Sequence, residues 1–231
     1  LGLCLNKARV KEILSYYGIP TPRSVLIRKL PLENGEHHLD FPLIVKPSFE
    51  DASLGIDNKS VVYSWNELEQ RVKFVLEEFN QPCLVEEYIE GREINVAILG
   101  NAEPAALPLS EIDFSSLPEG YPHIVSYNSK WIKGSIEFDC TIPVCPAPLE
   151  KITEKKVKEF ALRAYKILGL RDYARVDIRL DRNGKPFVIE VNPNPDLSDD
   201  AGFARSGSVA GMDYHTLVQK IVEIALERNN K

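Results

Sequence analysis

One segment near the carboxyl end of the chain limits the possible folds more than any other. Two runs with strand periodicity, residues 174–180 and 186–192, flank the sequence Asp-Arg-Asn-Gly, and such a turn between two strand runs is typical of a β-hairpin. Because side chains alternate along a strand, the first run places its four apolar residues on one face and Arg175, Asp177 and Arg179 on the other. The chain is therefore predicted to contain an antiparallel sheet with one apolar and one charged face.

The length of the turn sets the register of this hairpin. If residues 181–184 form the loop, Leu180 pairs with Lys185. Alternation along the second strand then places Phe187 on the apolar face and Val188 on the charged face. This register also decides which charged side chains meet.

Three oxygen-bearing side chains gather in this register. Arg175 lies opposite Glu190, and Asp177 is a diagonal neighbour of Glu190, within reach of long side chains. Asn192 follows on the same face. Three oxygen ligands without histidine or cysteine suit a hard cation such as Mg2+, which usually shares its coordination shell with nucleotide phosphates. An exposed sheet face with an Arg175–Glu190 pair explains the same alternation, so both interpretations stay open.

Two stretches earlier in the chain could hold a nucleotide. Lys46 ends an apolar run over residues 41–47, and the loop after it could offer backbone donors to a phosphate. That loop contains only Gly55, so it is not a Walker-type phosphate loop. In residues 84–93 an apolar strand runs into acidic residues and a glycine. Such a segment can offer backbone groups to an adenine edge and a carboxylate to ribose hydroxyls. A lysine extended along the surface and a charged surface turn are the alternatives.

The composition excludes two classes of partner. The chain has 231 residues and a net charge of -6, and an acidic chain is a poor candidate for sequence-independent nucleic-acid binding, which depends on neutralising phosphates. No apolar run approaches the roughly 20 residues that a membrane helix needs. None of the four cysteines forms a C-x-x-C pair, which fits reduced thiols in a cytoplasmic protein. We therefore expect a cytoplasmic protein that binds neither nucleic acid nor membrane.

Helical and strand patterns are mixed along the chain without strict alternation, which predicts an α+β fold. The pattern shifts near residues 88–105, so we expect two subdomains, over residues 1–95 with the leading helix and over residues 96–231. Residues 111–138 and 192–211 lack a sustained period and are expected to be loops. A stretch as long as the first of these is usually functional or disordered.

Six motifs follow one another along nearly the whole chain. They are Asn6-Lys7-x-x-x-Lys11, Phe41–Ser48, Leu84–Glu93, Cys145–Ala147, Tyr173–Asp177 and Ile189–Asn192. In this order they resemble the ATP-grasp superfamily and, within it, the D-alanine–D-alanine ligase branch. The ordered set is far more specific than any single motif. The resemblance implies an ATP-grasp fold in which two α+β subdomains clamp a nucleotide.

The resemblance also implies roles for individual residues. Lys7, Lys46 and Lys130 would contact the ATP phosphates, and Arg175 would act with Lys130 in catalysis by stabilising the charged acyl intermediate. The residues that would hold adenine and ribose are Glu86, the backbone of Glu87 and Ile89, Glu93 and Ile189. The implied ligands of two Mg2+ ions, or of Mn2+ in their place, are Asp177, Glu190 and Asn192, the set at which the hairpin argument also arrives.

The implied reaction is the ATP-dependent joining of a small-molecule carboxylate to an amine. The carboxylate attacks the γ-phosphate to give an acyl phosphate and ADP, and the amine then displaces phosphate. Residues 111–135 would form a lid that excludes water. Phosphoryl transfer to a small molecule without amide formation, and a non-catalytic ATP-binding module, stay open as alternatives. The resemblance also allows a homodimer.

The sequence departs from this branch where the substrates would bind. Ala52 stands where the dipeptide ligases place a serine, and Trp131 stands where they place a tyrosine. Their glycine and Ser-Leu pair, which grip the acceptor carboxylate, are replaced by a segment with three aspartates, Asp196, Asp199 and Asp200. Three carboxylates favour a cationic acceptor over an anionic one, although Arg205 could still bind a carboxylate. We therefore expect an amine-bearing acceptor other than free D-alanine.

The start of the sequence carries one more expectation. A gene product normally starts with methionine, whereas this chain starts with Leu1 and its single methionine is Met212. Leu1 also lies where the ATP-grasp part of these ligases begins. We therefore expect a piece of a longer ligase whose amino-terminal domain is absent.

Overall fold

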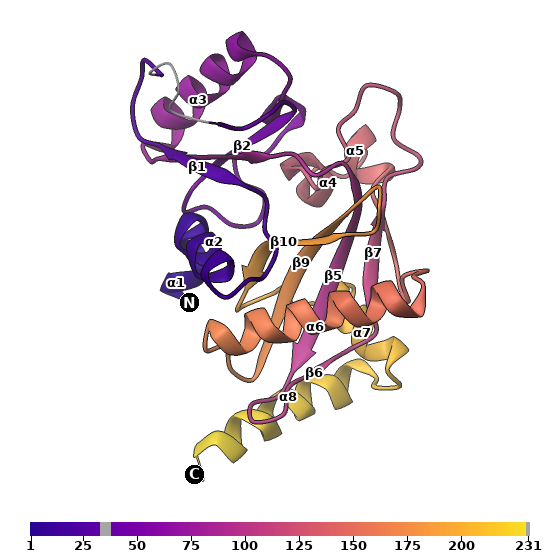
Figure 1. The fold of residues 1–231 in the computed structure, drawn as a ribbon. Helices are drawn as coiled ribbons and strands as arrows, with labels where there is room; N and C mark the ends of the chain where they lie inside the picture. Colours follow the sequence, from indigo (N-terminus) through magenta and orange to yellow (C-terminus); the bar gives the residue numbers. More distant parts are fainter. Residues whose placement is uncertain (33–37, 230–231) are drawn as a thin grey trace.

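The computed structural model describes residues 1–32 and 38–229. Within them the chain forms two units, each built on its own antiparallel sheet with helices packed against it (Figure 1). Helices and antiparallel strands thus occur together in both units, and the expected α+β class is confirmed.

The smaller unit contains a four-stranded sheet in the order β1-β4-β2-β3. Its strands are β1 (Ser24–Ile27), β2 (Leu43–Pro47), β3 (Val61–Val62), which a 3-10 turn η1 (Asn58–Ser60) precedes, and β4 (Cys83–Glu87). Helix α3 (Trp65–Phe79) covers one face, where its Leu68, Val72 and Val75 pack on alternate residues of β2 and β4. The residues between these alternate ones, Ile44 and Lys46 on β2 and Leu84 and Glu86 on β4, therefore share the other face of the sheet.

The larger unit contains a sheet in the order β10-β9-β5-β7-β8, with β6 paired to β5. Its strands are β5 (Gly91–Leu99), β6 (Ala105–Ala106), β7 (Ser110–Asp113), β8 (Ile142–Val144), β9 (Tyr173–Asp181) and β10 (Pro186–Asn192). The predicted hairpin is the β9–β10 pair, and β5 joins β9 along its whole length. The hairpin strands therefore lie at one side of the sheet, next to its central strand.

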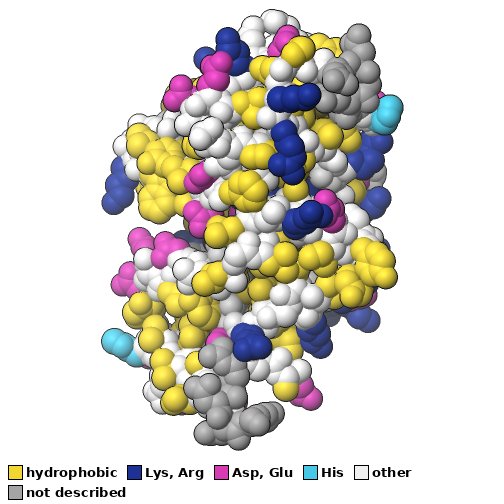
Figure 2. All heavy atoms as spheres, turned by 90° about the vertical axis from the view of Figure 1, so that its left-hand side faces the viewer, with side chains coloured by type: hydrophobic (Ala, Val, Ile, Leu, Met, Phe, Trp, Pro, Cys, Tyr) yellow, Lys and Arg dark blue, Asp and Glu magenta, His cyan; other side chains and the backbone are white. Residues whose placement is uncertain are grey.

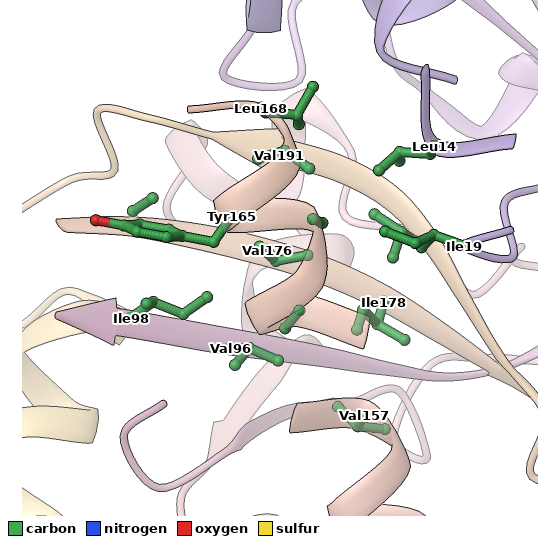
Figure 3. Close-up of a cluster of buried hydrophobic side chains, with 14 of the residues drawn as sticks. Leu14, Ile19, Val96, Ile98, Val157, Tyr165, Leu168, Val176, Ile178 and Val191 are labelled. Atoms are coloured by element: carbon green, nitrogen blue, oxygen red, sulfur yellow. The ribbon is translucent and has the colours of Figure 1, made fainter. Parts of the chain in front are cut away.

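Helices cover both faces of this sheet. Figure 1 shows α6 (Lys151–Ile167) running across the strands, and its apolar side packs on Val96 and Ile98 of β5 in the main core (Figure 3). The alternate residues Ala97 and Leu99 pack instead with α7 (Gly202–Val209) and α8 (Tyr214–Asn229). The alternation of β5 thus divides the apolar residues between two cores.

The leading helices contact both units. Asn6 caps α2 (Lys7–Tyr16), because its side-chain oxygen accepts a hydrogen bond from the amide of Arg9 at 3.1 Å. The short α1 (Gly2–Leu5) precedes it, and the apolar residues of both helices pack into the core of the larger unit, as Leu14 does in Figure 3. The polar side chains of α2 meanwhile contact the smaller unit, where Lys7 donates to the Glu50 carbonyl and Lys11 pairs with Glu86. The sheets change between β4 and β5, a few residues before the predicted division at residue 95, and we propose that the two subdomains are divided in this region.

Two segments expected as loops contain short helices. Residues 111–138 include α4 (Tyr127–Trp131) and α5 (Ile136–Asp139), and residues 192–211 include α7. Ser126 and Ser135 cap the first two, each through a side-chain oxygen that accepts a backbone N–H. Helices of four or five residues show no sustained periodicity in sequence, which is why the pattern missed them. None of the described helices combines the length and apolar character needed to cross a membrane.

Candidate active site

A cleft of about 710 Å³ opens between the two sheets. Most of the site residues predicted from the sequence line it, namely Lys7, Lys46, Glu86, Glu87, Ile89, Glu93, Lys130, Arg175, Asp177, Ile189 and Glu190. Of the predicted set, Asn192 is not among the described residues that form its wall. The cleft therefore brings together residues from α2, α4 and both sheets.

The wall formed by the smaller sheet carries a buried carboxylate shared by two lysines. Glu86 of β4 is 1% exposed, one of its oxygens contacts the ammonium group of Lys46 on β2, and the other lies 2.7 Å from the ammonium group of Lys11 on α2. Burial alone would raise the pKa of Glu86, but the two ammonium groups lower it to about 2. Burial lowers the pKa of Lys11 in turn. Glu86 is therefore ionised at neutral pH.

The link between the sheets is fixed from both sides. In the smaller unit the Glu87 amide donates to the carbonyl of Arg23 at 3.0 Å. From the larger unit the Arg179 guanidinium, only 4% exposed, donates to the carbonyls of Ile89 and Gly91 at 3.0 and 3.1 Å. The backbone expected to meet adenine therefore has a defined path.

Arg179 also contacts a buried acid at the end of this link. Its guanidinium lies 3.3 Å from a carboxylate oxygen of Glu93 on β5. Burial raises the pKa of Glu93 above its ordinary value, and Arg179 opposes that rise. Glu93 lines the cleft, so its carboxylate sits between a buried cation and the space where a ligand would lie.

The hairpin register differs from the predicted one. Leu180 pairs with Pro186 rather than Lys185, and the register shifts between Val188 and Glu190. A bulge places two residues opposite one and so reverses the faces beyond it. Val188 lies before the bulge and opposite Ile178, because the turn is one residue longer than predicted, so it packs in the main core instead of facing the charged side. The sequence could not reveal this, because strand alternation predicts faces only where no residue is inserted.

The bulge changes which polar groups meet. Glu190 lies directly opposite Asp177, and Asn192 opposite Arg175, so the expected Arg175–Glu190 pairing is wrong. On the other side of β9, Asn95 of β5 also lies opposite Asp177. A row of three oxygen-bearing side chains thus crosses β5, β9 and β10 at one level of the sheet.

Asp177 is held on two sides. The guanidinium of Arg175, two residues earlier on the same strand, donates to both carboxylate oxygens at 2.7 and 2.8 Å. The Asn95 amide donates to one of them at 2.8 Å. Burial opposes the charge of Arg175, but the carboxylates of Asp177 and Glu190 raise its pKa above the ordinary value. Asp177 itself is 4% exposed, so its position is rigidly defined.

Besides Arg175, a second cation reaches this row of side chains from α2. The ammonium group of Lys7 lies 3.5 Å from a carboxylate oxygen of Glu190, and it also donates to the backbone carbonyl of Glu50. Lys7 therefore connects the loop after β2 with the hairpin, at the point where the two units face each other.

The oxygen donors fit a hard cation. Within residues 1–32 and 38–229, no group of three or more His, Cys, Asp and Glu side chains could hold a metal ion. A metal at this place would therefore rest on the facing carboxylates of Asp177 and Glu190, with an amide oxygen and groups of a bound substrate. Mg2+ is usually bound in this manner, by one or two carboxylates together with phosphates and water. The Asn192 side-chain oxygen already accepts one hydrogen bond, from the Asn194 amide at 2.9 Å.

Hydrogen bonds join the segment expected as a lid to the loop after β2. The Trp131 indole N–H donates to the carbonyl of Ala52 at 3.0 Å, and the Ser53 hydroxyl donates to the carbonyl of Val125 at 2.8 Å. Asn58 donates to the carboxylate of Glu137 at 3.1 Å. The two positions that depart from the family pattern, Ala52 and Trp131, therefore contact each other.

The segment with three aspartates contributes to the wall of the cleft. Asp196 and Asp200 line it, together with Arg205 of α7, whereas Asp199 does not. The Arg205 guanidinium donates to the carbonyl of Asp200 at 2.9 Å. Hydrogen bonds from Ser198 lower the pKa of Asp196. Two of the three aspartates of this segment thus face the cleft, whereas all three were expected there.

Three residues at the site had no role in the sequence interpretation. They are Lys11, Asn95 and Arg179. Lys11 belongs to the first motif and Arg179 to the charged face of the hairpin, so both gave a signal. Asn95 gave none, because it meets Asp177 from a strand 82 positions away in the sequence.

Comparisons with known sequences agree on one family. A sequence model described as the D-ala D-ala ligase C-terminus matches residues 12–223. An uncharacterised protein of Sinorhizobium fredii is 35% identical over 227 residues, which cover 98% of this chain and 64% of that protein. The D-alanine–D-alanine ligase of Pelotomaculum thermopropionicum is 30% identical over 235 residues, with coverage of 98% and 69%. The chain thus spans about two thirds of the length of these relatives.

Solved structures confirm the expected ATP-grasp fold. D-alanine–D-alanine ligase from Bacillus anthracis complexed with ATP has a TM-score of 0.78 at 28% identity, and the alignment covers 99% of this chain and 68% of that one. The VanG D-Ala:D-Ser ligase from Enterococcus faecalis has a TM-score of 0.76 at 26% identity, with coverage of 96% and 62%. These similarities cover both sheets and the cleft between them.

Proposed function

Because the chain belongs to the family of D-alanine–D-alanine ligase C-terminal domains, we propose that it is the nucleotide-binding part of an ATP-dependent ligase that joins a carboxylate to an amine. One observation carries this proposal: a single cleft has Lys46 paired with the buried Glu86 on one wall and facing carboxylates on the other. The solved relative with ATP supports the nucleotide as the ligand. The reaction would pass through an acyl phosphate and release ADP and phosphate.

The cationic residues would hold the phosphates and the charge that develops between them. Lys7, Lys46 and Lys130 reach the cleft from α2, β2 and α4. Cations fixed in advance around transferring phosphoryl oxygens stabilise the transition state without reorganising. Arg175, oriented by its two hydrogen bonds to Asp177, would stabilise the negative acyl intermediate.

The remaining residues of the site would hold the base, the sugar and the metal. Glu86, the backbone of Glu87 and Ile89, Glu93 and Ile189 would contact adenine and ribose. Asp177, Glu190 and Asn192 would hold two Mg2+ ions, or Mn2+ in their place. When bound, such ions neutralise charge on the phosphate oxygens.

Trapping with hydroxylamine tests the proposed chemistry. With ATP, Mg2+ and a panel of small carboxylates, an acyl phosphate yields a hydroxamate together with ADP. ADP without any hydroxamate would favour phosphoryl transfer to another group. ATP binding without ADP release, both from the chain and from the chain fused to the part of a relative that it does not cover, would indicate a non-catalytic binding module.

We further propose that the acceptor is an amine-bearing molecule other than free D-alanine. Asp196 and Asp200 line the cleft and would repel an acceptor carboxylate bound beside them. The relative that is a D-Ala:D-Ser ligase supports variation of the acceptor on this fold. An ADP-release assay over a panel of amines tests this, and D-alanine as the best donor and the best acceptor would refute it.

The cellular setting is also a proposal. Cys4, Cys83, Cys140 and Cys145 are free thiols in the structure, which agrees with a cytoplasmic location. Figure 2 shows lysine and arginine side chains interspersed with acidic and hydrophobic ones on the face that it presents. Such a mixed surface agrees with small-molecule substrates rather than nucleic acid. A homodimer is compatible with the family and is tested by light scattering.

A further inference from the structure

Lys11 occupies a position that a lysine rarely holds. Its side chain is 6% exposed, and lysines are almost never buried unless paired. The ammonium group lies 2.7 Å from a carboxylate oxygen of Glu86 and donates to the Thr21 hydroxyl at 2.8 Å. Lys11 does not line the main cleft in the described part of the chain. It lies instead beside a separate cavity with Thr21 and Leu84.

The register of the smaller sheet shows why Lys11 and Lys46 reach the same acid. Ile44 lies opposite Glu86, so Lys46, two residues further along β2, is its diagonal neighbour on the same face. Lys46 approaches Glu86 from the cleft, whereas Lys11 approaches from α2. One carboxylate thus separates a lysine at the cleft from a lysine outside it.

The charge count of this cluster has a consequence for any anion in the cleft. A Glu86–Lys46 pair alone would be neutral, and the carboxylate would cancel the charge that Lys46 presents to a phosphate. With Lys11 added, two ammonium groups share one carboxylate, and the cluster carries one net positive charge. Charges act strongly in such a buried setting because they are poorly screened.

We propose that Lys11 is a positioning residue of the nucleotide site, which offsets the charge of Glu86 so that the charge of Lys46 stays available to phosphate. Lys11 holds the Glu86 carboxylate from outside the cleft, and Glu86 in turn holds the ammonium group of Lys46 at the cleft wall. The inference rests on the proposed function, because it requires that the cleft binds a nucleotide.

The alternative is that Lys11 only fastens α2 to the smaller sheet. The two roles differ in what each variant should do. A fastening residue affects stability and lowers the affinity for every ligand alike. A charge-balancing residue affects phosphate-bearing ligands most, and its loss is corrected when Glu86 is neutralised as well.

Calorimetric titration of ATP, ADP and AMP into the full chain separates these roles. Lys11→Met should weaken ATP binding by about tenfold or more, as expected for the loss of one buried charge near the phosphates, and AMP binding by much less. Lys11→Arg should keep ATP affinity within about threefold of the unchanged chain. The double variant Lys11→Met with Glu86→Gln restores the net charge and should regain most of the lost affinity. Lys73→Met serves as the control, because Lys73 is 62% exposed and pairs with Glu77 on α3.

Each outcome decides the question. Equal ATP affinity of Lys11→Met and the unchanged chain, an equal loss for ATP and AMP, or a double variant no better than Lys11→Met would overturn the inference alone. If the unchanged chain binds no ATP, the proposed function fails and the inference fails with it. If Lys11→Met does not fold, the double variant decides: retained ATP affinity supports charge balance, and a folded double variant without it refutes charge balance.

Discussion

The two walls of the cleft differ in the balance between cationic and anionic side chains. On the smaller sheet, Lys11 and Lys46 share the single carboxylate of Glu86, so cations are in excess. On the larger sheet, Arg175 and Lys7 accompany the carboxylates of Asp177 and Glu190, so the charges balance. The first wall can attract an anion directly. The second wall holds carboxylate oxygens in place, where we propose that a cation binds.

The walls also differ in how the groups are held. Glu86 receives its partners from two other elements, α2 and β2, so its environment exists only when helix and sheet are assembled. Asp177 receives its closest partner from its own strand, two residues away. We name the wall on the smaller sheet, where we propose that phosphate binds, the phosphate wall, and the wall on the larger sheet, where we propose that a metal binds, the metal wall. We infer that the phosphate wall depends on packing between elements, whereas the metal wall depends mainly on one hairpin and its neighbour β5.

The largest expected effect comes from breaking the metal wall. Asp177→Asn keeps the shape of the side chain but removes its charge, and we expect kcat of the ligase to fall by roughly a thousandfold, the upper range for loss of one electrostatic contributor. ATP affinity should fall far less, because the phosphate wall is unchanged. Steady-state ADP release and ATP titration measure both. Asp199→Asn is the control, since Asp199 is exposed and outside the cleft. Unchanged turnover of Asp177→Asn would remove Asp177 from the metal site.

The second largest effect is a loss of folding stability when the charge of Glu86 in the phosphate wall is removed. Glu86→Gln leaves two buried lysines without a counter-charge, and removing one partner of a buried ion pair costs about 3–5 kcal/mol. Urea unfolding at neutral pH should show this loss. Glu87→Gln, which removes a partly exposed pair with Arg23, should cost less than about 1 kcal/mol.

The stability difference between the unchanged chain and Glu86→Gln should depend on pH, and the sign of this dependence can be stated. The pKa of Glu86 in the folded chain is about 2, below its ordinary value of 4.5. A carboxylate with a lowered pKa stabilises the fold above its ordinary pKa and loses that contribution as the pH falls through the folded value. The stability difference between the unchanged chain and Glu86→Gln should therefore shrink between pH 4.5 and about 2. A difference that stays constant over this range would contradict the assignment.

The smallest expected effect concerns residues 111–135, the segment that we propose as a lid. Trp131→Phe removes the hydrogen bond to the Ala52 carbonyl but keeps an aromatic ring, and loss of one such bond costs about 0.5–1.5 kcal/mol. We expect a few-fold rise in KM for ATP with little change in unfolding temperature. Trp65→Phe on α3 is the matched control, and in that background the fluorescence of Trp131 reports lid movement. A KM that is equal in both variants would show that this contact does not hold the lid.

Much of the architecture followed from local patterns. The alternation of β9 placed Ala174, Val176, Ile178 and Leu180 on one face, and all four lie in the main core. The motif order gave the ATP-grasp fold, and nearly all of the residues expected at the site line one cleft. These features depend on spacing within a few residues, which the sequence displays directly.

What only the tertiary structure decided depends on contacts between distant segments. The bulge before Glu190 set the facing pairs of the hairpin, and no local pattern encodes where a residue is inserted. The shared Glu86, the Asn95 contact and the Trp131–Ala52 bond each join elements far apart in the chain. The sequence alone determined which chemical groups this protein has and, along β9, on which faces they lie. Only the packing of helix against sheet, and of one sheet across from the other, determined which of these groups touch, because burial and charge balance arise from the assembled fold.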